Sequence, residues 1–450
     1  MDGATTARPA LPPRTLRMLE APVLPTLLRL AAPNLAEAAA RIGFIAADAV
    51  FVGWLGADAL AGVSLVFPIF LLMQMVSASG FGTGVAAGVA RALGAGDREG
   101  ADRLAAHALW LALGAGALSS AAVLAGGSAL WRALGAEGAA LEAASTYAAV
   151  TFGGIVLVWL MNLLANVARG TGAMPVAAGA IVLGEAVHLT LSPCLVLGLG
   201  PFPAMGVAGA ALAILGAYGT GAAMLLAYLL SPRSAARIRR GALALRWAAL
   251  RVILSVGGLT AVTVLLTQAT SLAATALVAG FGAAALAGFG AAQRLELLQI
   301  PLTFALGSAV IAMVAANLGA GRMARARQVA RAGMAIAGVI GLGFGAVALL
   351  LPASWMGLFV AGEAAEAGAL YLRCLGAMLP VFGVALGAAF ALLGMGEAGR
   401  PAVAGLVRFL AVAIGGWAAL GFGMLGLFVA IALAALAFSI LLLAWARRLL

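Results

Sequence analysis

Runs of 18 or more mostly apolar residues recur from one end of this 450-residue chain to the other. A helix of that length crosses the hydrocarbon core of a bilayer, which is about 30 Å thick. Hydrophobic residues make up 64% of the chain and charged residues 9%, a balance unlike that of a soluble domain. The short alternating segments typical of a membrane barrel do not occur in the sequence. The chain is therefore predicted to be an all-α polytopic membrane protein.

Clusters of glycine, proline and arginine separate the apolar runs into twelve predicted transmembrane helices. The longest polar connection lies at the middle of the chain, and we expect no soluble domain between the spans. The predicted spans are 27–52, 59–89, 104–127, 145–168, 175–197, 206–230, 252–279, 285–316, 329–351, 369–393, 401–420 and 424–446.

All 26 basic residues are arginine, and their positions predict the orientation of the chain. Twenty-one of them, Arg169 included, lie at the two ends and in alternate loops, whereas the opposite loops hold only Arg132. Cytoplasmic loops carry the excess of positive charge, so both termini are predicted to be cytoplasmic, in the cytoplasmic (inner) membrane. Membrane orientation thus accounts for the net charge of +11, and binding of nucleic acid is not expected.

The sequence carries little of the chemistry that cofactors and metals need. Cys194 and Cys374 are the only cysteines, both within apolar runs, and there are two histidines in all. Catalytic triads, nucleotide-binding loops and metal-ligand clusters are absent. We expect no cofactor, no metal and no enzyme activity, so an ion gradient would have to drive any pumping. Residues 1–26 lack the apolar core of a secretory signal and are predicted to form a cytoplasmic tail.

Short segments of the first half recur in the second half at an offset of 224 to 226 residues. Three such matches in chain order indicate a duplication. Each copy holds six spans, so the two copies have the same orientation, as parallel repeats do. We expect an N-lobe at 27–230, a basic cytoplasmic connector with six arginines at 231–251, and a C-lobe at 252–450. The matches are 56–62 with 282–288, 93–97 with 318–322, and 170–172 with 394–396.

The first predicted span has one polar stripe on an otherwise apolar helix. At about 100° per residue, four of its polar residues fall within about 60° of one another. A carboxylate in the bilayer costs about 2.5–3.5 kcal/mol, so Asp48 should face the protein interior or a water-filled cavity. Glu37 and Arg41 are spaced to pair with each other, which leaves a purely structural role open for them. The stripe consists of Asn34, Glu37, Arg41 and Asp48.

Polar residues also share one face in spans 5 and 4. Glu185, His188 and Ser192 line up in span 5, where the imidazole would be able to accept or relay a proton. Asn162 and Asn166 lie one turn apart in span 4 and offer amide oxygens to a cation or a substrate. The alternative for both sets is hydrogen bonding that holds helices together.

The second half offers hydroxyl and charged candidates. Thr263 and Thr267 belong to a threonine stripe in span 7, which would either line a wet cavity or hydrogen bond to its own helix. Arg294 and Glu296 in span 8 are two residues apart, so they point in different directions and should find partners on other helices. Arg294 is a candidate counter-ion for an acid.

The segment from Asp48 to Val63, DAVFVGWLGADALAGV, resembles the first-span signature of the multidrug and toxic compound extrusion (MATE) family. Residues 93–97, 169–172 and 206–211 resemble further family motifs in the expected order. The resemblance extends over essentially the whole chain and is to the DinF-like and NorM-like bacterial branches. It implies twelve helices in two lobes that rock to exchange organic, often cationic, compounds for protons or sodium. It also implies that Asp48 is the essential coupling acid.

Two departures from the family pattern bear on the coupling ion. The usual Asn-x-x-x-Asp-Pro of span 5 here reads His188-x-x-x-Ser192-Pro193, and Ile214 stands where the resemblance leads one to expect threonine. The N-lobe therefore lacks one carboxylate and one hydroxyl, and hard cations prefer several oxygen ligands. This favours the proton over sodium, with Asp48 as its carrier.

The sequence thus predicts a proton-coupled antiporter that exports small organic compounds, acting as a monomer in the lipid bilayer. A lipid-linked precursor flippase of the same superfamily is the alternative, with cationic residues such as Arg41 and Arg294 in its cleft. A channel or an intramembrane enzyme is more remote, because neither a selectivity filter nor a nucleophile–base pair is evident.

Overall fold

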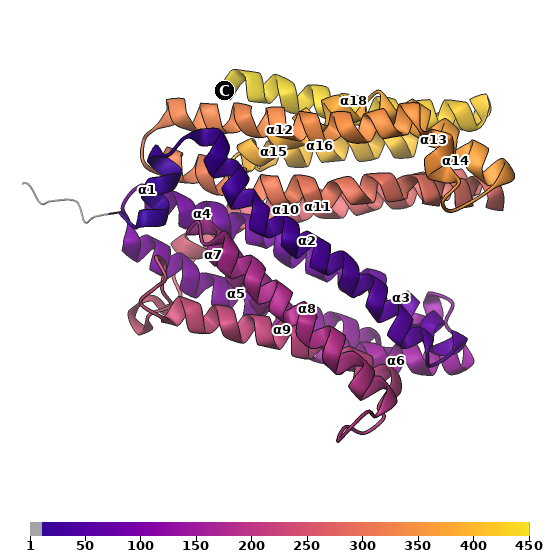
Figure 1. Ribbon diagram of the computed structural model, residues 1–450, viewed down its shortest axis with the longest axis horizontal. Helices are drawn as coiled ribbons and strands as arrows, with labels where there is room; N and C mark the ends of the chain where they lie inside the picture. Colours follow the sequence, from indigo (N-terminus) through magenta and orange to yellow (C-terminus); the bar gives the residue numbers. More distant parts are fainter. Residues whose placement is uncertain (1–10, 450) are drawn as a thin grey trace, which may run out of the picture. The chain divides into compact units, whose positions relative to one another are not determined.

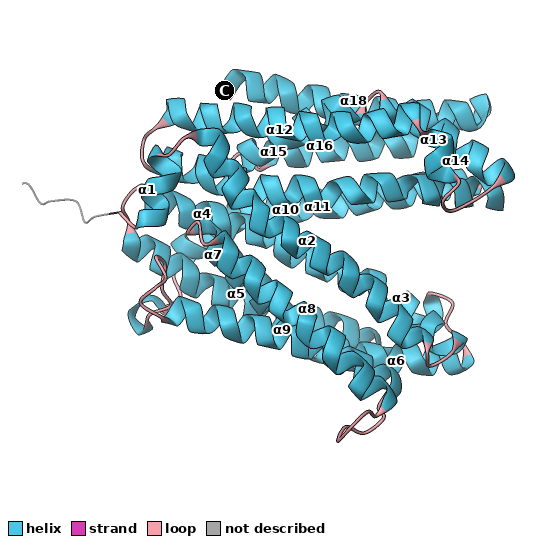
Figure 2. Cartoon of the chain, viewed as in Figure 1, coloured by secondary structure: helices cyan, strands magenta, loops and turns pink. Residues whose placement is uncertain are grey.

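The computed structural model describes residues 11–449, in helix α2 without the side chains of residues 42, 44–46 and 49. Every regular element in this part of the chain is a helix, which confirms the predicted all-α class (Figure 2). The chain forms two compact units. The first is Met1–Arg17 with Ala32–Leu254, and the second is Met18–Ala31 with Ser255–Leu450. The division passes through helices α1, α2 and α10, and in α2 it falls between Ala31 and Ala32.

The first unit, hereafter the N-terminal unit, contains the helices drawn in indigo to magenta in Figure 1. Its core is formed mainly by alanine, valine and leucine, with buried aromatic rings such as Phe70 and Phe152. The helices are α1 (Pro13–Glu20), α2 (Val23–Gly53), α3 (Ala57–Met75), the π-helix η1 (Val76–Phe81), α4 (Gly82–Gly94), α5 (Arg98–Ala133), α6 (Gly138–Gly153), α7 (Ile155–Gly170), α8 (Met174–Leu197) and α9 (Gly206–Leu230), followed by the 3₁₀ turn η2 (Arg240–Ala242).

The second unit, hereafter the C-terminal unit, contains the remaining helices. Phe289, Tyr371 and Phe428 pack ring against ring in its core. Its helices are α10 (Trp247–Ala279), α11 (Ala283–Gly319), α12 (Met323–Leu350), α13 (Pro352–Met356), α14 (Gly362–Gly376), α15 (Leu379–Met395), α16 (Gly399–Leu410), the π-helix η3 (Ala411–Gly415), α17 (Gly416–Ala419), the 3₁₀ turn η4 (Leu420–Phe422) and α18 (Gly423–Leu449).

Among the described residues, eight helices are long and apolar enough to cross a membrane, or ten when each of two bent helix pairs counts as one span. The predicted twelve spans are obtained when two further changes are made to this count. The run 399–449 is divided at Gly423, whose φ of +72° marks a break before α18. Helix α2 is then added, because its polar face lowers its apolar content without shortening it. The chain is a polytopic membrane protein.

Two predicted spans are bent where the sequence analysis drew continuous helices. α6 and α7 meet at Gly154 with a bend of 46°, and α14 and α15 meet at a bend of 58°. A Cβ on Gly154 would collide with the side chain of Leu215, so the bend occurs where a glycine permits close packing. α10 begins at Trp247, five residues before the predicted start of span 7, so the connector is shorter than expected.

The three repeated segments have the same backbone conformation in both units. Gly56 and Gly282 precede α3 and α11 with φ values of +104° and +99°, and both have a ψ of 174°. Such angles are open to glycine and strained for other residues. The pairs Gly96 with Gly321 and Gly172 with Gly396 likewise share positive φ. Gly96 and Gly321 follow the ends of α4 and α11.

Glycine also sets the helix spacing in both copies. A Cβ on Gly62 would collide with the carbonyl oxygen of Ala140, and one on Gly288 would collide with that of Ala364. These glycines bring α3 against α6 and α11 against α14 at backbone contact distance. In membranes, where helix association depends on packing, such close contacts are a main source of stability.

Candidate functional site

The polar stripe of α2 faces the interior of the N-terminal unit. Asn34, Glu37 and Asp48 are buried, and Arg41 is partly buried. The amide nitrogen of Asn34 lies 3.8 Å from the sulfur of Met174, at the start of α8. Placing Glu37, Arg41 and Asp48 on the packed face of the helix keeps these charged groups away from lipid.

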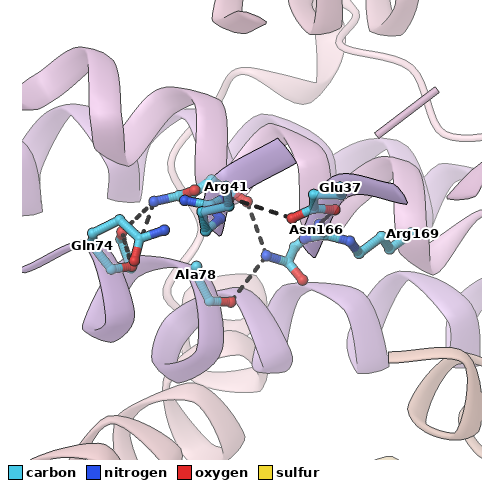
Figure 3. A network of polar contacts seen from close by, with 8 residues as sticks. Glu37, Arg41, Gln74, Ala78, Asn166 and Arg169 are labelled. Carbon is cyan, nitrogen blue, oxygen red and sulfur yellow. Dashed lines mark hydrogen bonds and ion pairs between the residues drawn. The ribbon is translucent and has the colours of Figure 1, made fainter. Parts of the chain in front are cut away.

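Glu37 is held between two guanidinium groups (Figure 3). Its Oε2 atom accepts a hydrogen bond of 2.6 Å from Arg169 on α7, and its Oε1 atom lies 3.5 Å from Arg41, one turn along α2. Arg169 is only 2% exposed. The sequence analysis placed Arg169 among the loop arginines, which was wrong. It missed this residue because only the packing of α7 on the unit's interior turns the last turn of that helix toward α2.

Asp48 forms a buried pair with His188 on α8. The Nε2 atom of His188 lies 3.2 Å from Oδ1 of Asp48, and the two side chains are 0% and 4% exposed. The sequence shows no cation within one turn of Asp48, and its partner indeed comes from another helix. Ser192, one turn beyond His188, is buried beside it on the same helix face. An imidazole–carboxylate pair excluded from solvent is a place where one proton can be held between two groups.

Glu185 and Tyr218 complete the environment of Arg41. The guanidinium of Arg41 forms a hydrogen bond with the hydroxyl of Tyr218 on α9 and interacts electrostatically with Glu185 on α8. Glu185 is buried, and within the described part of the chain its Oε2 atom accepts no hydrogen bond. The stripe predicted on α8 therefore meets the stripe predicted on α2, with Glu185 near Arg41 and His188 at Asp48.

Asn162 and Asn166 bind the π-helix η1. Asn166 donates to the carbonyl oxygen of Ala78 at 3.0 Å (Figure 3). Asn162 donates to the hydroxyl of Ser77 at 2.8 Å. A π-turn breaks the regular i→i−4 hydrogen bonds, and these amides take up the polar groups that it presents. Gly82 is required there, since a Cβ would collide with the amide of Asn166. In this structure the two asparagines join helices, the alternative that the sequence left open.

The threonine candidates in the C-terminal unit hydrogen bond within their own helix. The hydroxyl of Thr263 donates to the carbonyl of Leu259 at 3.0 Å, and that of Thr267 donates to Thr263 at 2.8 Å. Thr263 is half-buried and Thr267 is exposed. Hydroxyls satisfied in this way have little need of another partner.

Arg294 and Glu296 find separate partners, as their spacing on α11 predicts. The guanidinium of Arg294 lies 4.8 Å from the ring centre of Phe359, and Glu296 accepts a hydrogen bond of 2.5 Å from the hydroxyl of Tyr371 on α14. Within the described residues Arg294 forms no ion pair with an acid, in contrast to the role of counter-ion considered for it.

The comparisons with known proteins agree with this architecture. The MatE family model matches the chain twice, at residues 37–194 and 260–418, which confirms the duplication. An FAD transporter from Shewanella oneidensis is 30% identical over 320 residues, 69% of each chain. A probable multidrug resistance protein NorM from Deinococcus radiodurans is 27% identical over 416 residues, 87% of each chain.

Solved structures share the fold over nearly the whole chain. A transporter of the MOP superfamily from Pyrococcus furiosus, described as having a binding pocket of reverse polarity, has a TM-score of 0.88 at 25% identity and 98% coverage of both chains. A MATE structure in the bent conformation has a TM-score of 0.90 at 24% identity, again with 98% coverage.

Fold and matches together define a class: an all-helical membrane transporter with two related units. The chain belongs to the MatE family, the MATE transporters that its sequence resembles.

Proposed function

We propose that this protein is a secondary antiporter of the cytoplasmic membrane, with both termini in the cytoplasm, which exports organic compounds in exchange for protons. The family and the names of the relatives support transport of organic molecules. The observation that carries proton coupling is the buried Asp48–His188 pair.

The charges of the buried network support this assignment. Its carboxylates are Glu37, Asp48 and Glu185, and its guanidiniums are Arg41 and Arg169. With every carboxylate ionised and His188 neutral, the network carries one net negative charge. A net charge away from water is unfavourable, so one proton or one cationic substrate makes the network neutral. The proton and the cationic substrate compete to neutralise the same negative charge. Binding of one therefore favours release of the other, and this coupling gives exchange.

The two halves of the network have different tasks in this proposal. Glu37 is fixed by a direct ion pair with Arg169 at 2.6 Å, and we assign this pair a structural role. Asp48 has no guanidinium partner of that kind, and its neighbour is an imidazole that can gain and lose a proton. The exchanging proton is therefore held by Asp48 and His188, with Glu185 as the nearby acid on α8.

The same geometry favours the proton over sodium. A hard cation needs several oxygen ligands around it. His188 places a nitrogen 3.2 Å from the Asp48 carboxylate, on the side from which a further oxygen ligand would otherwise come.

Proteoliposomes with separately imposed gradients test this function. We expect a pH gradient to drive a cationic dye such as ethidium toward the acidic compartment. An equal sodium gradient at uniform pH should drive no movement of the dye. Full transport with the sodium gradient alone would contradict proton coupling. Absence of exchange with any organic cation would contradict the multidrug assignment.

A flavin dinucleotide is a second candidate substrate, favoured by the Shewanella oneidensis relative named as an FAD transporter. Its pyrophosphate would need a cation, and Arg41 is the partly exposed guanidinium on the polar face of α2. Counterflow of FAD in proteoliposomes tests this. Arg41→Gln should abolish FAD exchange and spare exchange of a cationic dye, and equal loss of both would contradict a role for Arg41 in substrate choice.

A further inference from the structure

A basic pocket lies in the N-terminal unit, and neither Asp48 nor His188 lines it. Its volume is about 550 Å³. It is enclosed by the start of α1, the start of α5, the end of α9 and residues 232–239 of the connector. Among the described residues that line it, Asp102 is the single acid, against five arginines. The arginines are Arg14, Arg98, Arg233, Arg237 and Arg239.

The connector that forms one wall of the pocket is held in place by specific bonds to α5. The carboxylate of Asp102 accepts a hydrogen bond of 2.6 Å from the backbone N–H of Arg237 and lies 3.1 Å from the Nε atom of Arg239. Trp110 donates its indole N–H to the carbonyl of Leu243 at 2.9 Å. The wall is thus built by the fold, although its sequence is that of a polar linker.

His107 fixes the end of the same wall. Its Nδ1 atom lies 2.7 Å from the carbonyl oxygen of Arg103, so Nδ1 carries the proton. The Nε2 atom is then an acceptor, and it receives a hydrogen bond of 2.9 Å from the backbone N–H of Arg246. This buried histidine works as a neutral clamp on the connector, which explains the second of the two histidines in the chain.

The described residues that line the pocket carry more positive than negative charge. Asp102 pairs with Arg239, while Arg14 donates to the hydroxyl of Tyr228 and Arg237 to the carbonyl of Pro232, both neutral acceptors. The guanidinium of Arg233 has no hydrogen bond or ion pair within residues 11–449. Five guanidiniums facing one carboxylate leave a formal excess of four positive charges around one cavity. An anion with several acceptor oxygens would satisfy them.

The chemistry of the donors and the surroundings identifies the anion. Guanidinium groups match phosphate oxygens in bidentate geometry, better than they match a single chloride. Exposed apolar side chains stand close by in the sequence: Leu245 is 68% exposed, Trp247 67% and Trp110 43%. Tryptophans beside arginines are typical of the membrane–water interface, the depth at which lipid phosphates lie.

We propose that this pocket is a binding site for a phosphate group, presented by an anionic phospholipid headgroup or by a soluble phosphate compound. The bound phosphate bridges α1, α5 and the connector. None of its residues belongs to the ionisable network at Asp48, so the site is independent of the proposed coupling mechanism.

The test uses the purified full-length protein. The protein is exchanged in phosphatidylcholine micelles that either contain or lack phosphatidylglycerol. Native mass spectrometry then measures how much phosphatidylglycerol the protein retains. The variant is Arg14→Gln/Arg233→Gln, and the matched control is Arg447→Gln/Arg448→Gln, which removes the same charge from the exposed last turn of α18. At about 1 kcal/mol per arginine, the pocket variant should lose roughly thirtyfold in affinity for phosphatidylglycerol and the control much less.

A second arm distinguishes the two sources of phosphate. Wild-type protein is titrated with inorganic phosphate, against sodium chloride at equal ionic strength, and its thermal unfolding is followed. Phosphate that displaces the lipid or raises the unfolding temperature, in the wild type and not in the pocket variant, identifies a soluble ligand. Lipid retention that phosphate leaves unchanged identifies the headgroup.

Equal losses in the pocket variant and the control, with no response to phosphate, would overturn the proposal. If the double variant does not fold, Arg233→Gln alone serves as the variant. Its exposed side chain makes no bond whose loss would destabilise the fold.

Discussion

The N-terminal and C-terminal units share a glycine frame and differ in what their first helices carry. The offset of 226 that relates Gly56 to Gly282 also relates the four polar residues of α2 to positions on α10. There each ionisable or amide side chain has a small, uncharged counterpart. Asn34 corresponds to Thr260, Glu37 to Thr263, Arg41 to Thr267 and Asp48 to Ala274.

The two units also differ in the residue at the contact between their second and fourth spans. In the N-terminal unit Asn166 lies against Gly82 and binds the π-helix η1, whereas in the C-terminal unit Phe390 lies against Gly307. There α11 runs as a regular α-helix through the positions that correspond to η1. A phenyl ring fills the space that an amide and freed carbonyl groups occupy in the other copy.

The comparison teaches that the frame and the chemistry are separable. Close glycine contacts and positive-φ glycines set the shape of both units, and one of them alone carries a buried ionisable network on its first helix. The ion-coupling step of the proposed cycle is therefore assigned to the N-terminal unit.

The largest expected loss of stability comes from replacing a residue of the N-terminal unit by its counterpart in the C-terminal unit. Arg169→Leu imports Leu393, its counterpart at an offset of 224, and leaves Glu37 without its 2.6 Å partner. Breaking a buried ion pair from one side costs about 3–5 kcal/mol in the free energy of unfolding. Thermal unfolding in detergent measures it. The double variant Glu37→Thr/Arg169→Leu should recover most of the loss, and a double variant as unstable as Arg169→Leu would contradict the pairing.

A smaller effect tests whether the frame is the same in both units. Gly62→Ala and Gly288→Ala each push a methyl group into a backbone carbonyl, so each should lower the free energy of unfolding by about 1–3 kcal/mol. Gly114→Ala and Gly343→Ala are the controls, because open space surrounds both positions. These should be neutral or stabilising by up to about 1 kcal/mol. A large loss in only one of the two units would show that the frames differ.

The smallest effect is expected at the threonine stripe. Thr263→Val and Thr267→Val remove hydroxyls that bond only to their own helix, so the free energy of unfolding should change by less than about 0.5 kcal/mol. Dye transport should stay at the wild-type rate, in contrast to Glu37→Gln, at the position of α2 that corresponds to Thr263. Transport lost in the threonine variants would place part of the substrate path on this face of α10.

The sequence predicts the features that are set by patterns along the chain, and not those that are set by contacts between helices. Apolar length, the glycine repeats and the polar face of α2 are local patterns, and each of them appears in the structure. The partners of that face are not local: Arg169 follows Glu37 by 132 residues, and His188 follows Asp48 by 140. The sequence predicts that α2 and α8 each carry a polar stripe, but only helix packing decides which side chains meet.

The helix bends and the π-helix were beyond sequence reasoning for a related reason. A π-turn is stabilised by amides on another helix, Asn162 and Asn166, and no local propensity marks it. The bend at Gly154 depends on Leu215 of α9 filling the space beside it. A connector of arginines and alanines reads as a linker, although Asp102 and His107 hold it as a structured wall.

The most direct test of the account is substrate-induced proton release by the purified protein, followed with a pH indicator in weakly buffered detergent solution. Wild-type protein should release protons when ethidium binds, and Asp48→Asn should release none while remaining folded. Glu296→Gln, which alters a half-buried carboxyl of the C-terminal unit, should release as many as the wild type. Undiminished release by Asp48→Asn, or its loss in Glu296→Gln, would contradict the assignment of coupling to the N-terminal unit.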